Sequence, residues 1–359
     1  MTAPAHSRIL RSLMSPSPPL PRASLAVVVA TLLWGCSPAP SDNQPTATGI
    51  PATGQGPDQG RGGPPRYQGL TVTEAQLDAI QQTCSETPKA PLGSRYSGPV
   101  VDAHVHTALE NDQGAFALAL IGEMNQNGVS RVLIQADHSP GLTADPGPLE
   151  LYREVEASWG RIASVCDRII PLIYAFDPTD SSAWAYVKER LATGNYGGVG
   201  EIEFLHTRMG IRKPVHSDTM DRIYEALEAG KMIFHFQAEP AGEPELGKEI
   251  AELIESHPGI RFVWFGGEAC FDQPGVENLL CTVFPSRGLK IVQGLTDWQK
   301  VRLVLGTDAS PAGLHSSSAG HLPYASLGDG VGIIRDLLAP MQPSTAAAVG
   351  HGNFDRLVK

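Results

Sequence analysis

From Gly98 onward, short apolar runs rich in β-branched residues alternate with longer amphipathic stretches, and this alternation constrains the fold more than any other feature. It is typical of βαβ units and a parallel sheet. The runs predicted to be strands are residues 100–103, 131–135, 169–175, 198–204, 231–236, 261–265, 289–293 and 302–306. Helices are predicted at residues 114–127, 149–166, 182–193, 217–229, 245–257 and 345–358. Eight parallel strands, each followed by a helix, favour a closed (β/α)8 TIM barrel.

One predicted unit is irregular. Only residues 294–301 separate the seventh and eighth predicted strands. A parallel crossover normally takes about ten or more residues. Either the seventh helix is reduced to a turn, or the seventh strand lies elsewhere.

Residues 1–36 have the features of an export signal. Arginines precede an apolar run at 25–34, which is shorter than the roughly 20 apolar residues of a membrane-spanning helix. The run ends in Leu-Trp-Gly-Cys, which resembles a bacterial lipobox with Cys36 as the lipidated residue. We therefore expect a periplasmic or cell-envelope protein anchored to a bacterial membrane by lipid, with a plain secretory signal as the alternative.

The segment between the signal and the barrel has two parts. Residues 37–66 are rich in Ser, Pro, Gly, Thr and Gln, cannot bury a core, and are predicted to be a disordered tether. Residues 67–97 form a helical lead-in, in which Thr73 caps a helix that ends at Cys84. The barrel then occupies residues 98–359. Four cysteines outside the signal, Cys84, Cys166, Cys270 and Cys281, allow three pairings; we expect buried thiols or one incidental bridge.

The formal net charge of the chain is -11, and no basic run is present. This argues against a nucleic-acid backbone as the main partner. We expect a small-molecule substrate, and contact with a membrane only through the lipid anchor.

Histidines and a carboxylate gather where the barrel strands end. His104 and His106 are two residues apart at the end of the first strand, so both face one side. Side chains at the carboxyl ends of barrel strands face the active site, and paired imidazoles suit a divalent metal. His235 ends the fifth strand at the same end of the barrel. Asp308 follows the eighth strand, where a carboxylate can bind metal and accept a proton from an attacking water.

Further candidates lie on the third and fourth strands and in the loops. Glu201 and Glu203 stand in an apolar strand, where carboxylates are costly unless they are paired or bound to metal. Glu201 could bridge two metals; a salt bridge with a barrel Lys or Arg is the alternative. His138, Tyr174 and His206 lie just past strand ends and could bind substrate or protonate a leaving group, although each could be an ordinary loop residue.

Several motifs together resemble the amidohydrolase superfamily. They are VVDAHVH, MNQNGVSRVLI, IIPLIYAFDP, GGVGEIEF, IFHF, VLGTDAS and GNFDRLV. The nearest branch is the amidohydrolase-2 group, which includes aminocarboxymuconate-semialdehyde decarboxylase. The resemblance implies that His104, His106, His235 and Asp308 are metal ligands. The GEIE segment is similar to TatD-type phosphodiesterases, which implies that Glu201 is a ligand too. One or two divalent ions, with zinc favoured, are the implied cofactor.

The sequence departs from this family on the sixth strand. The family usually carries a His at the end of that strand, where Trp264 or Phe265 stands here. The site is then mononuclear with its chemistry on Asp308, or it has lost activity, or another residue takes over. The candidates for that replacement are Glu268, His138 and His206. The predicted function is a metal-dependent hydrolase that activates water to cleave an amide, ester or lactone. The alternatives are a metal-dependent decarboxylase of the same fold and a non-catalytic binding lipoprotein.

Overall fold

The computed structural model describes residues 69–107, 112–136, 149–207, 210–240, 243–265, 268–273, 276–283, 291–296, 300, 302–309 and 327–358. Every statement below concerns these residues. The predicted signal, Cys36, the predicted tether and His138 lie outside them, as does the side chain of Glu268.

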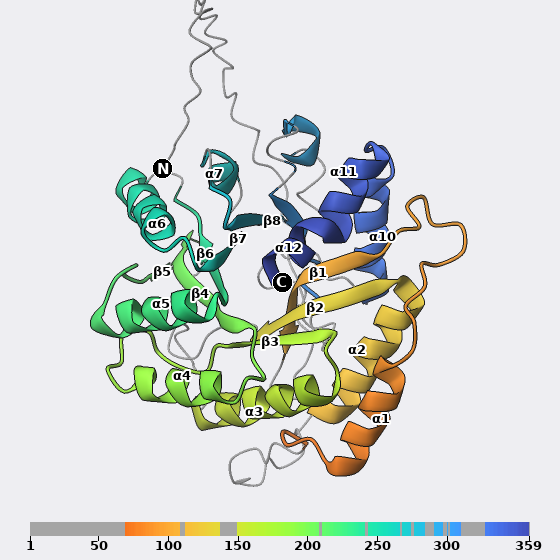
Figure 1. The fold of residues 1–359 in the computed structure, drawn as a ribbon, viewed down its shortest axis with the longest axis horizontal. Coiled ribbons are helices and arrows are strands. Elements are labelled where there is room, and N and C mark those ends of the chain that lie inside the picture. The colour runs from red at the N-terminus through yellow and green to blue at the C-terminus, as the bar shows by residue number, and fades with distance from the viewer. Residues whose placement is uncertain are drawn as a thin grey trace, which may run out of the picture. The chain divides into compact units, whose positions relative to one another are not determined.

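Eight parallel strands form a barrel in the order in which they occur along the chain (Figure 1). They are β1 (Val100–Thr107), β2 (Val129–Ala136), β3 (Ile169–Ile173), β4 (Gly198–His206), β6 (Ile233–Ala238), β7 (Arg261–Phe265), β8 (Leu279–Val283) and β9 (Leu303–Leu305). A bridge between Val105 and Ala309 joins the first strand to the chain after the last, and the His106 amide donates to the Ala309 carbonyl over 2.8 Å. The predicted (β/α)8 architecture is confirmed by this nearly closed parallel barrel.

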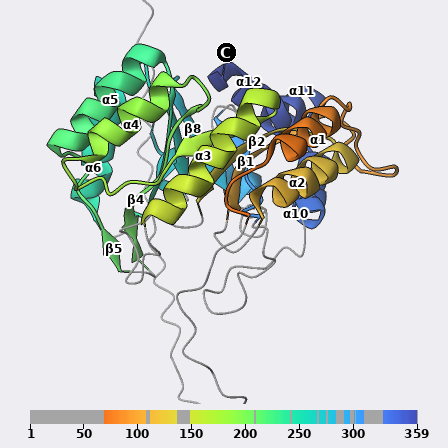
Figure 2. The ribbon, with the colours of Figure 1, turned by 90° about the horizontal axis from the view of Figure 1, so that it is seen from below.

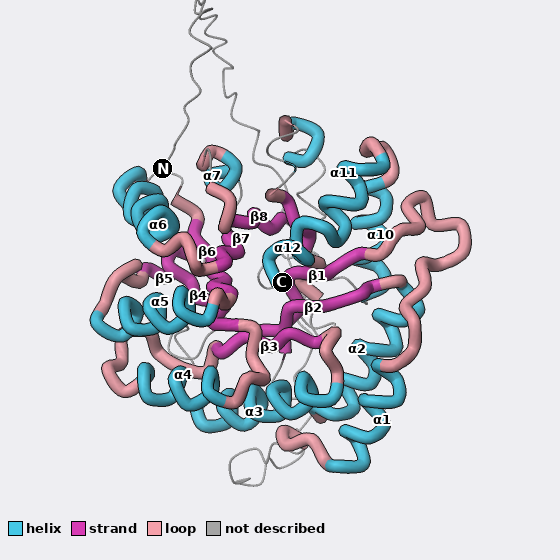
Figure 3. Tube along the Cα trace, viewed as in Figure 1, coloured by secondary structure: helices cyan, strands magenta, loops and turns pink. Residues whose placement is uncertain are grey.

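Helices surround the strands (Figures 1 and 3). They are α1 (Glu74–Cys84), α2 (Gln113–Asn127), α3 (Leu149–Val165), α4 (Ala183–Ala192), α5 (Asp218–Gly230), α6 (Pro244–Ser256), α7 (Glu268–Phe271), α10 (Leu327–Leu338), α11 (Pro343–Ala347), the π-helical turn η2 (Ala348–Gly352) and α12 (Asn353–Val358). The short strand β5 (Ile211–Arg212) pairs antiparallel with the end of β4. Figure 2 shows the helical layer from the side. None of the described helices is long and apolar enough to cross a membrane.

The predicted position of the seventh strand is wrong. The strand is β8 at Leu279–Val283, which pairs with β7 and β9, whereas residues 291–294 are helical. Both segments are short apolar runs with β-branched residues, so composition alone could not separate them. With β8 in place, the connection to β9 is long enough for a parallel crossover, and the irregular unit disappears.

The interior of the barrel is filled by one small apolar cluster, separate from the larger cluster between sheet and helices. Its members are Val101, Ala103, Leu133, Leu172, Ile233, Val263, Leu280, Val304 and Phe354. Phe354 comes from α12, which lies over one end of the barrel in Figure 1. The barrel is therefore packed with side chains at that end, and its polar residues occupy the other.

The lead-in segment packs onto the barrel as an integral part of it. Thr73 caps α1 as predicted, with a reciprocal hydrogen bond to Gln76. A disulfide joins Cys84 at the end of α1 to Cys166, and the Arg168 guanidinium donates to the carbonyls of Cys84 and Glu86. These contacts connect the segment before β1 to the α3–β3 side of the barrel.

The expectation of free thiols or a single bridge is wrong, because the structure contains two disulfides. Besides Cys84–Cys166, Cys270 of α7 is bonded to Cys281 of β8. The second bridge spans 11 residues and attaches a four-residue helix to the barrel wall. Sequence spacing could not give the connectivity, since the partners are set by the three-dimensional contacts of α1 with α3 and of α7 with β8.

Candidate active site

A β-bulge in β1 aims His104 and His106 into the barrel. Both residues lie inside this strand, which runs to Thr107 and is longer than predicted. The pairing with β2 is irregular between Asp102 and Val105, where β1 advances by three residues while β2 advances by two. Ala103 belongs to the interior cluster, so strict alternation would turn His104 outward. The bulge reverses the alternation, and bulges commonly re-aim side chains next to active sites in this way.

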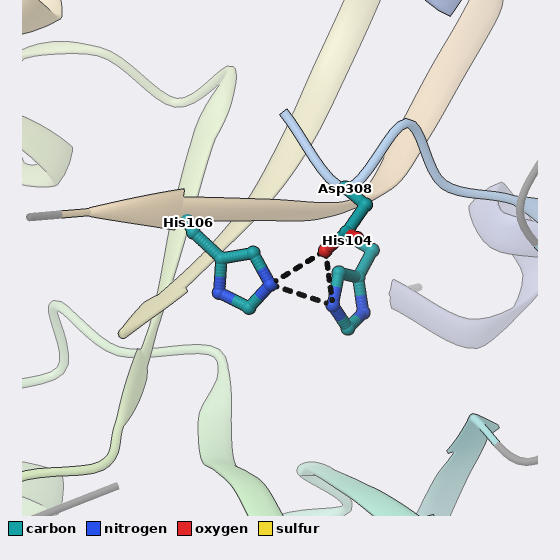
Figure 4. Close-up of side chains that lie close together, drawn as sticks. All are labelled: His104, His106 and Asp308. Atoms are coloured by element: carbon teal, nitrogen blue, oxygen red, sulfur yellow. Dashed lines mark hydrogen bonds and ion pairs between the residues drawn. The ribbon is translucent and has the colours of Figure 1, made fainter. Parts of the chain in front are cut away.

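His104, His106 and Asp308 converge on one point (Figure 4). The two Nε2 atoms of His104 and His106 are 2.9 Å apart. Asp308 Oδ1 lies 2.9 Å from His106 Nε2 and 3.5 Å from His104 Nε2. Three potential ligand atoms from the first and last strands of the barrel thus share one small volume.

The backbone around Asp308 holds its carboxylate in this place. The Asp308 amide donates to the His104 carbonyl over 2.9 Å, and its φ of 59° is in the left-handed region. Non-glycine residues seldom adopt this conformation, although Asp tolerates it better than most. The side chain of Asp308 is 17% exposed, against 1% for His104 and 4% for His106. Asp308 is therefore the member of the group that solvent or a substrate reaches most easily.

His235 and Glu201 form a second group around His104. His235 Nε2 is 3.3 Å from His104 Nδ1, and Glu201 Oε2 is 3.5 Å from His104 Nε2. All three residues are buried. β4 also has a bulge, between Val199 and Ile202, at the position of Glu201. The structure therefore brings all five predicted metal ligands together.

Burial controls the protonation of the site. Burial, together with the smaller effect of the nearby His106, lowers the pKa of His235 to about 3. A neutral imidazole keeps the lone pair that a metal needs. Burial also raises the pKa of Asp102 to about 7, although hydrogen bonds from Thr307 and from the His104 amide act to lower it.

The donor set fits a divalent cation. A tetrahedron of ligands at about 2.0–2.1 Å from an ion has edges of about 3.3 Å. The contacts that link His104 Nε2, His106 Nε2, Asp308 Oδ1 and Glu201 Oε2 are 2.9–3.5 Å. Three imidazoles and two carboxylates are ligand types that zinc, iron and manganese accept. The second ring nitrogen of His235, Nδ1, has no hydrogen-bond partner among the described residues. Imidazoles and carboxylates that approach one another this closely are the arrangement that a shared cation would hold.

The predicted substrate-binding residues differ in whether they lie next to the predicted metal ligands. Tyr174 is fully buried just after β3, and its hydroxyl is 3.3 Å from the Thr107 hydroxyl, beside His106. His206 is buried at the end of β4, and no contact links it to the ligand group in the described part of the chain. His138, the third candidate, lies outside the described residues.

Of the two residues at the end of the sixth strand, Phe265, and not Trp264, faces the predicted ligands. The Phe265 ring lies 5.1 Å from the His104 ring, centroid to centroid. Trp264 points the other way: its indole donates to the Ala238 carbonyl and packs against Phe236 in the layer between sheet and helices. The site wall that Phe265 forms is apolar and has neither a ligand nor a proton to offer.

Sequence reasoning missed three residues that contribute to the site. Gln135 of β2 is buried among the ligands, 3.0 Å from Glu201 Oε2. Asp102 and Thr307 connect the strands that carry the histidines and Asp308. Gln135 ends an apolar strand, as His235 does, so the rule that selected His235 could have found it.

No protein-family model and no curated protein matches the chain. Among solved structures, it is similar to 2,6-dihydroxybenzoate decarboxylase, with 11% identity, a TM-score of 0.47 and coverage of 73% of this chain and 99% of that one. 4-Oxalomesaconate hydratase from Rhodopseudomonas palustris has 11% identity and a TM-score of 0.48, with coverage of 72% of this chain and 95% of that one. An amidohydrolase from Mycobacterium avium subsp. paratuberculosis has 12% identity and a TM-score of 0.39, with coverage of 69% of this chain and 74% of that one.

Proposed function

We propose that the chain is a metal-dependent hydrolase that uses water to cleave an amide, ester or lactone bond of a small molecule. The observation that carries the proposal is the convergence of His104, His106 and Asp308 within 2.9–3.5 Å at the polar end of the barrel. His235 and Glu201 would complete the ligand set. A divalent cation held there, zinc being favoured by the imidazoles, would supply Lewis acidity that makes water acidic and polarises a carbonyl.

Asp308 is the proton acceptor in this proposal. Its side chain is more exposed than those of His104 and His106, and its Oδ1 atom contacts His106 Nε2. A carboxylate in this position orients an attacking water and accepts its proton. Tyr174 would close the side of the site next to Thr107 and hydrogen-bond the substrate. Phe265 excludes water from the side next to His104.

The activity test uses the full chain with substrate panels of lactones, N-acyl amino acids, phosphodiesters and aromatic β-keto or enoic acids. Asp308→Asn keeps an oxygen ligand but cannot take the proton. We expect it to retain metal and to lose about 10²–10⁴-fold in kcat on any substrate that is hydrolysed. Full activity in this variant would remove Asp308 from the mechanism. Release of carbon dioxide would identify the decarboxylase alternative, and a metal-free protein indifferent to chelator would identify a binding lipoprotein.

We also propose that the protein works outside the cytoplasm, anchored through Cys36. Two disulfides support this, because structural disulfides persist in oxidising compartments. Fractionation of bacteria that express the full chain should find it with membranes, and Cys36→Ser should release it or leave it unprocessed. Equal membrane association of wild type and Cys36→Ser would refute the lipid anchor.

A further inference from the structure

Gln135 places a side-chain amide among the charged residues of the site. It is the last inward-facing residue of β2 and is fully buried. Its Nε2 lies 3.0 Å from Glu201 Oε2 and 3.1 Å from each ring nitrogen of His104. The Gln135 side chain therefore contacts two of the predicted ligands, His104 and Glu201, through its amide nitrogen.

The amide oxygen of Gln135 has no hydrogen-bond partner among the described residues. Leaving a buried carbonyl oxygen unpaired costs free energy, and such atoms in native proteins are nearly always matched by a donor, a water or an ion. The other end of the same amide is satisfied by Glu201. The unmatched oxygen therefore points to a ligand that the described residues do not supply.

We propose that Gln135 is a ligand of the cation site, through its side-chain oxygen, on the side of Glu201 and His235. The proposal rests on the metal dependence proposed above. Amide oxygens are established ligands of divalent cations. In this arrangement the amide nitrogen holds Glu201 Oε2 while the oxygen contributes a neutral donor.

This assignment compensates for the departure on the sixth strand. Phe265 cannot coordinate, and it stands beside His104 where the family's additional His is expected. Gln135 reaches the same histidine from the second strand. The ligand group thus regains a donor, but an uncharged oxygen replaces an imidazole nitrogen. Oxygen donors favour manganese relative to zinc more than imidazoles do.

The test compares wild type with Gln135→Leu, Gln135→Glu and Thr282→Val. Apo protein is titrated with Zn2+ and Mn2+ against a chromophoric chelator, and the stability of the apo proteins is measured in urea. We expect Gln135→Leu to weaken binding at least tenfold, and to lower apo stability because Glu201 Oε2 loses its amide donor. Gln135→Glu should bind at least as tightly as wild type, since it retains an oxygen donor. Thr282→Val, which removes a buried hydroxyl near His104 that has no partner in the described structure, should bind as wild type does.

The outcomes separate this inference from the proposed function. If wild type binds metal, a His104→Ala/His106→Ala variant does not, and Gln135→Leu is unchanged, Gln135 is no ligand while the metal site stands. If Gln135→Glu, which keeps an oxygen but lacks the amide donor, binds metal as weakly as Gln135→Leu, Gln135 only positions Glu201. If wild type binds neither ion, the proposed function and this inference fall together.

Discussion

Thr307 donates two hydrogen bonds to one carboxylate, that of Asp102, and thereby joins the last strand of the barrel to the first. Its amide lies 2.9 Å from Asp102 Oδ1 and its hydroxyl 2.5 Å from Oδ2. The His104 amide donates to the same Oδ1 over 3.1 Å. Asp102 therefore sets the distance between the segment that carries His104 and the segment that carries Asp308.

The first prediction follows from this contact. Thr307→Val preserves the shape of the side chain but removes the donor to Asp102. We expect metal affinity to fall about 10–100-fold, as for other residues that orient metal ligands, and apo stability to fall by about 1–3 kcal/mol because a buried carboxylate oxygen loses its partner. Chelator competition and urea unfolding measure the two effects. The matched control is Thr282→Val in the neighbouring strand β8, which should change neither; equal behaviour of the two variants would show that the Asp102 contact has no special role.

The second prediction concerns the close approach of backbone to the ligands at Gly306. A Cβ at this position would lie 2.5 Å from the Cβ of His104. Gly306→Ala must displace His104 or the last strand, so we expect loss of metal binding together with destabilisation by about 1–3 kcal/mol. Gly332→Ala in α10 is the control, since nothing lies within 4 Å of its added Cβ and alanine favours a helix by about 1 kcal/mol. Metal binding by Gly306→Ala at the wild-type level would contradict the geometry of the site.

The third prediction distinguishes the two disulfides. In the loop-closure treatment, a bridge across 82 residues stabilises by about 4.5 kcal/mol and one across 11 residues by about 2.8 kcal/mol. We expect Cys84→Ala/Cys166→Ala to be the more destabilising double variant in urea. A thiol count on the denatured, unreduced full chain should find at most one free thiol among its five cysteines. Two or more free thiols would show that one of the bridges does not form.

The fourth prediction uses Glu156, whose buried carboxylate accepts from the amides of Tyr174 and Ala175 and from the Tyr186 hydroxyl. Burial raises the pKa of Glu156 above its usual 4.5, and these bonds offset the effect only in part. The folded protein therefore holds this proton more tightly than the unfolded chain. The contribution to stability is fully present below pH 4.5 and is lost as the pH rises through the folded pKa.

Glu156→Gln does not titrate, so the difference in unfolding free energy between wild type and variant should be largest in acid and should narrow as the pH rises. Urea unfolding of both proteins at several pH values between 4 and 8 measures this. A difference that widens with pH would mean that the hydrogen bonds outweigh burial and that the folded pKa is depressed.

The sequence was sufficient for the architecture and for the gathering of the predicted ligands at one end of the barrel, because both depend on local rules. Alternating strands and helices fix the barrel, and the carboxyl ends of its strands fix where His235 and Asp308 must lie. The same rules failed for β8, because the neighbouring apolar runs at Leu279–Val283 and at residues 289–293 both fit the pattern of a strand and only one of them is the strand. They also missed α10, whose Gly328, Gly330 and Gly332 reduce its helix propensity.

Details that depend on distant partners could not be predicted. The bulge in β1 that turns His104 inward is a feature of the pairing with β2, and no residue type marks it. The orientation of Phe265 toward His104, rather than Trp264, depends on the register of β7. Asp102 and Thr307 are 205 residues apart, and only the closed barrel brings them into contact.

The most direct test of the metal site is anomalous diffraction from crystals of the protein loaded with Zn2+, recorded at the zinc absorption edge. The account predicts a strong anomalous peak within coordination distance of His104 Nε2, His106 Nε2 and Asp308 Oδ1. Crystals that show no peak among these three atoms, or an ion bound only elsewhere on the protein, would contradict it.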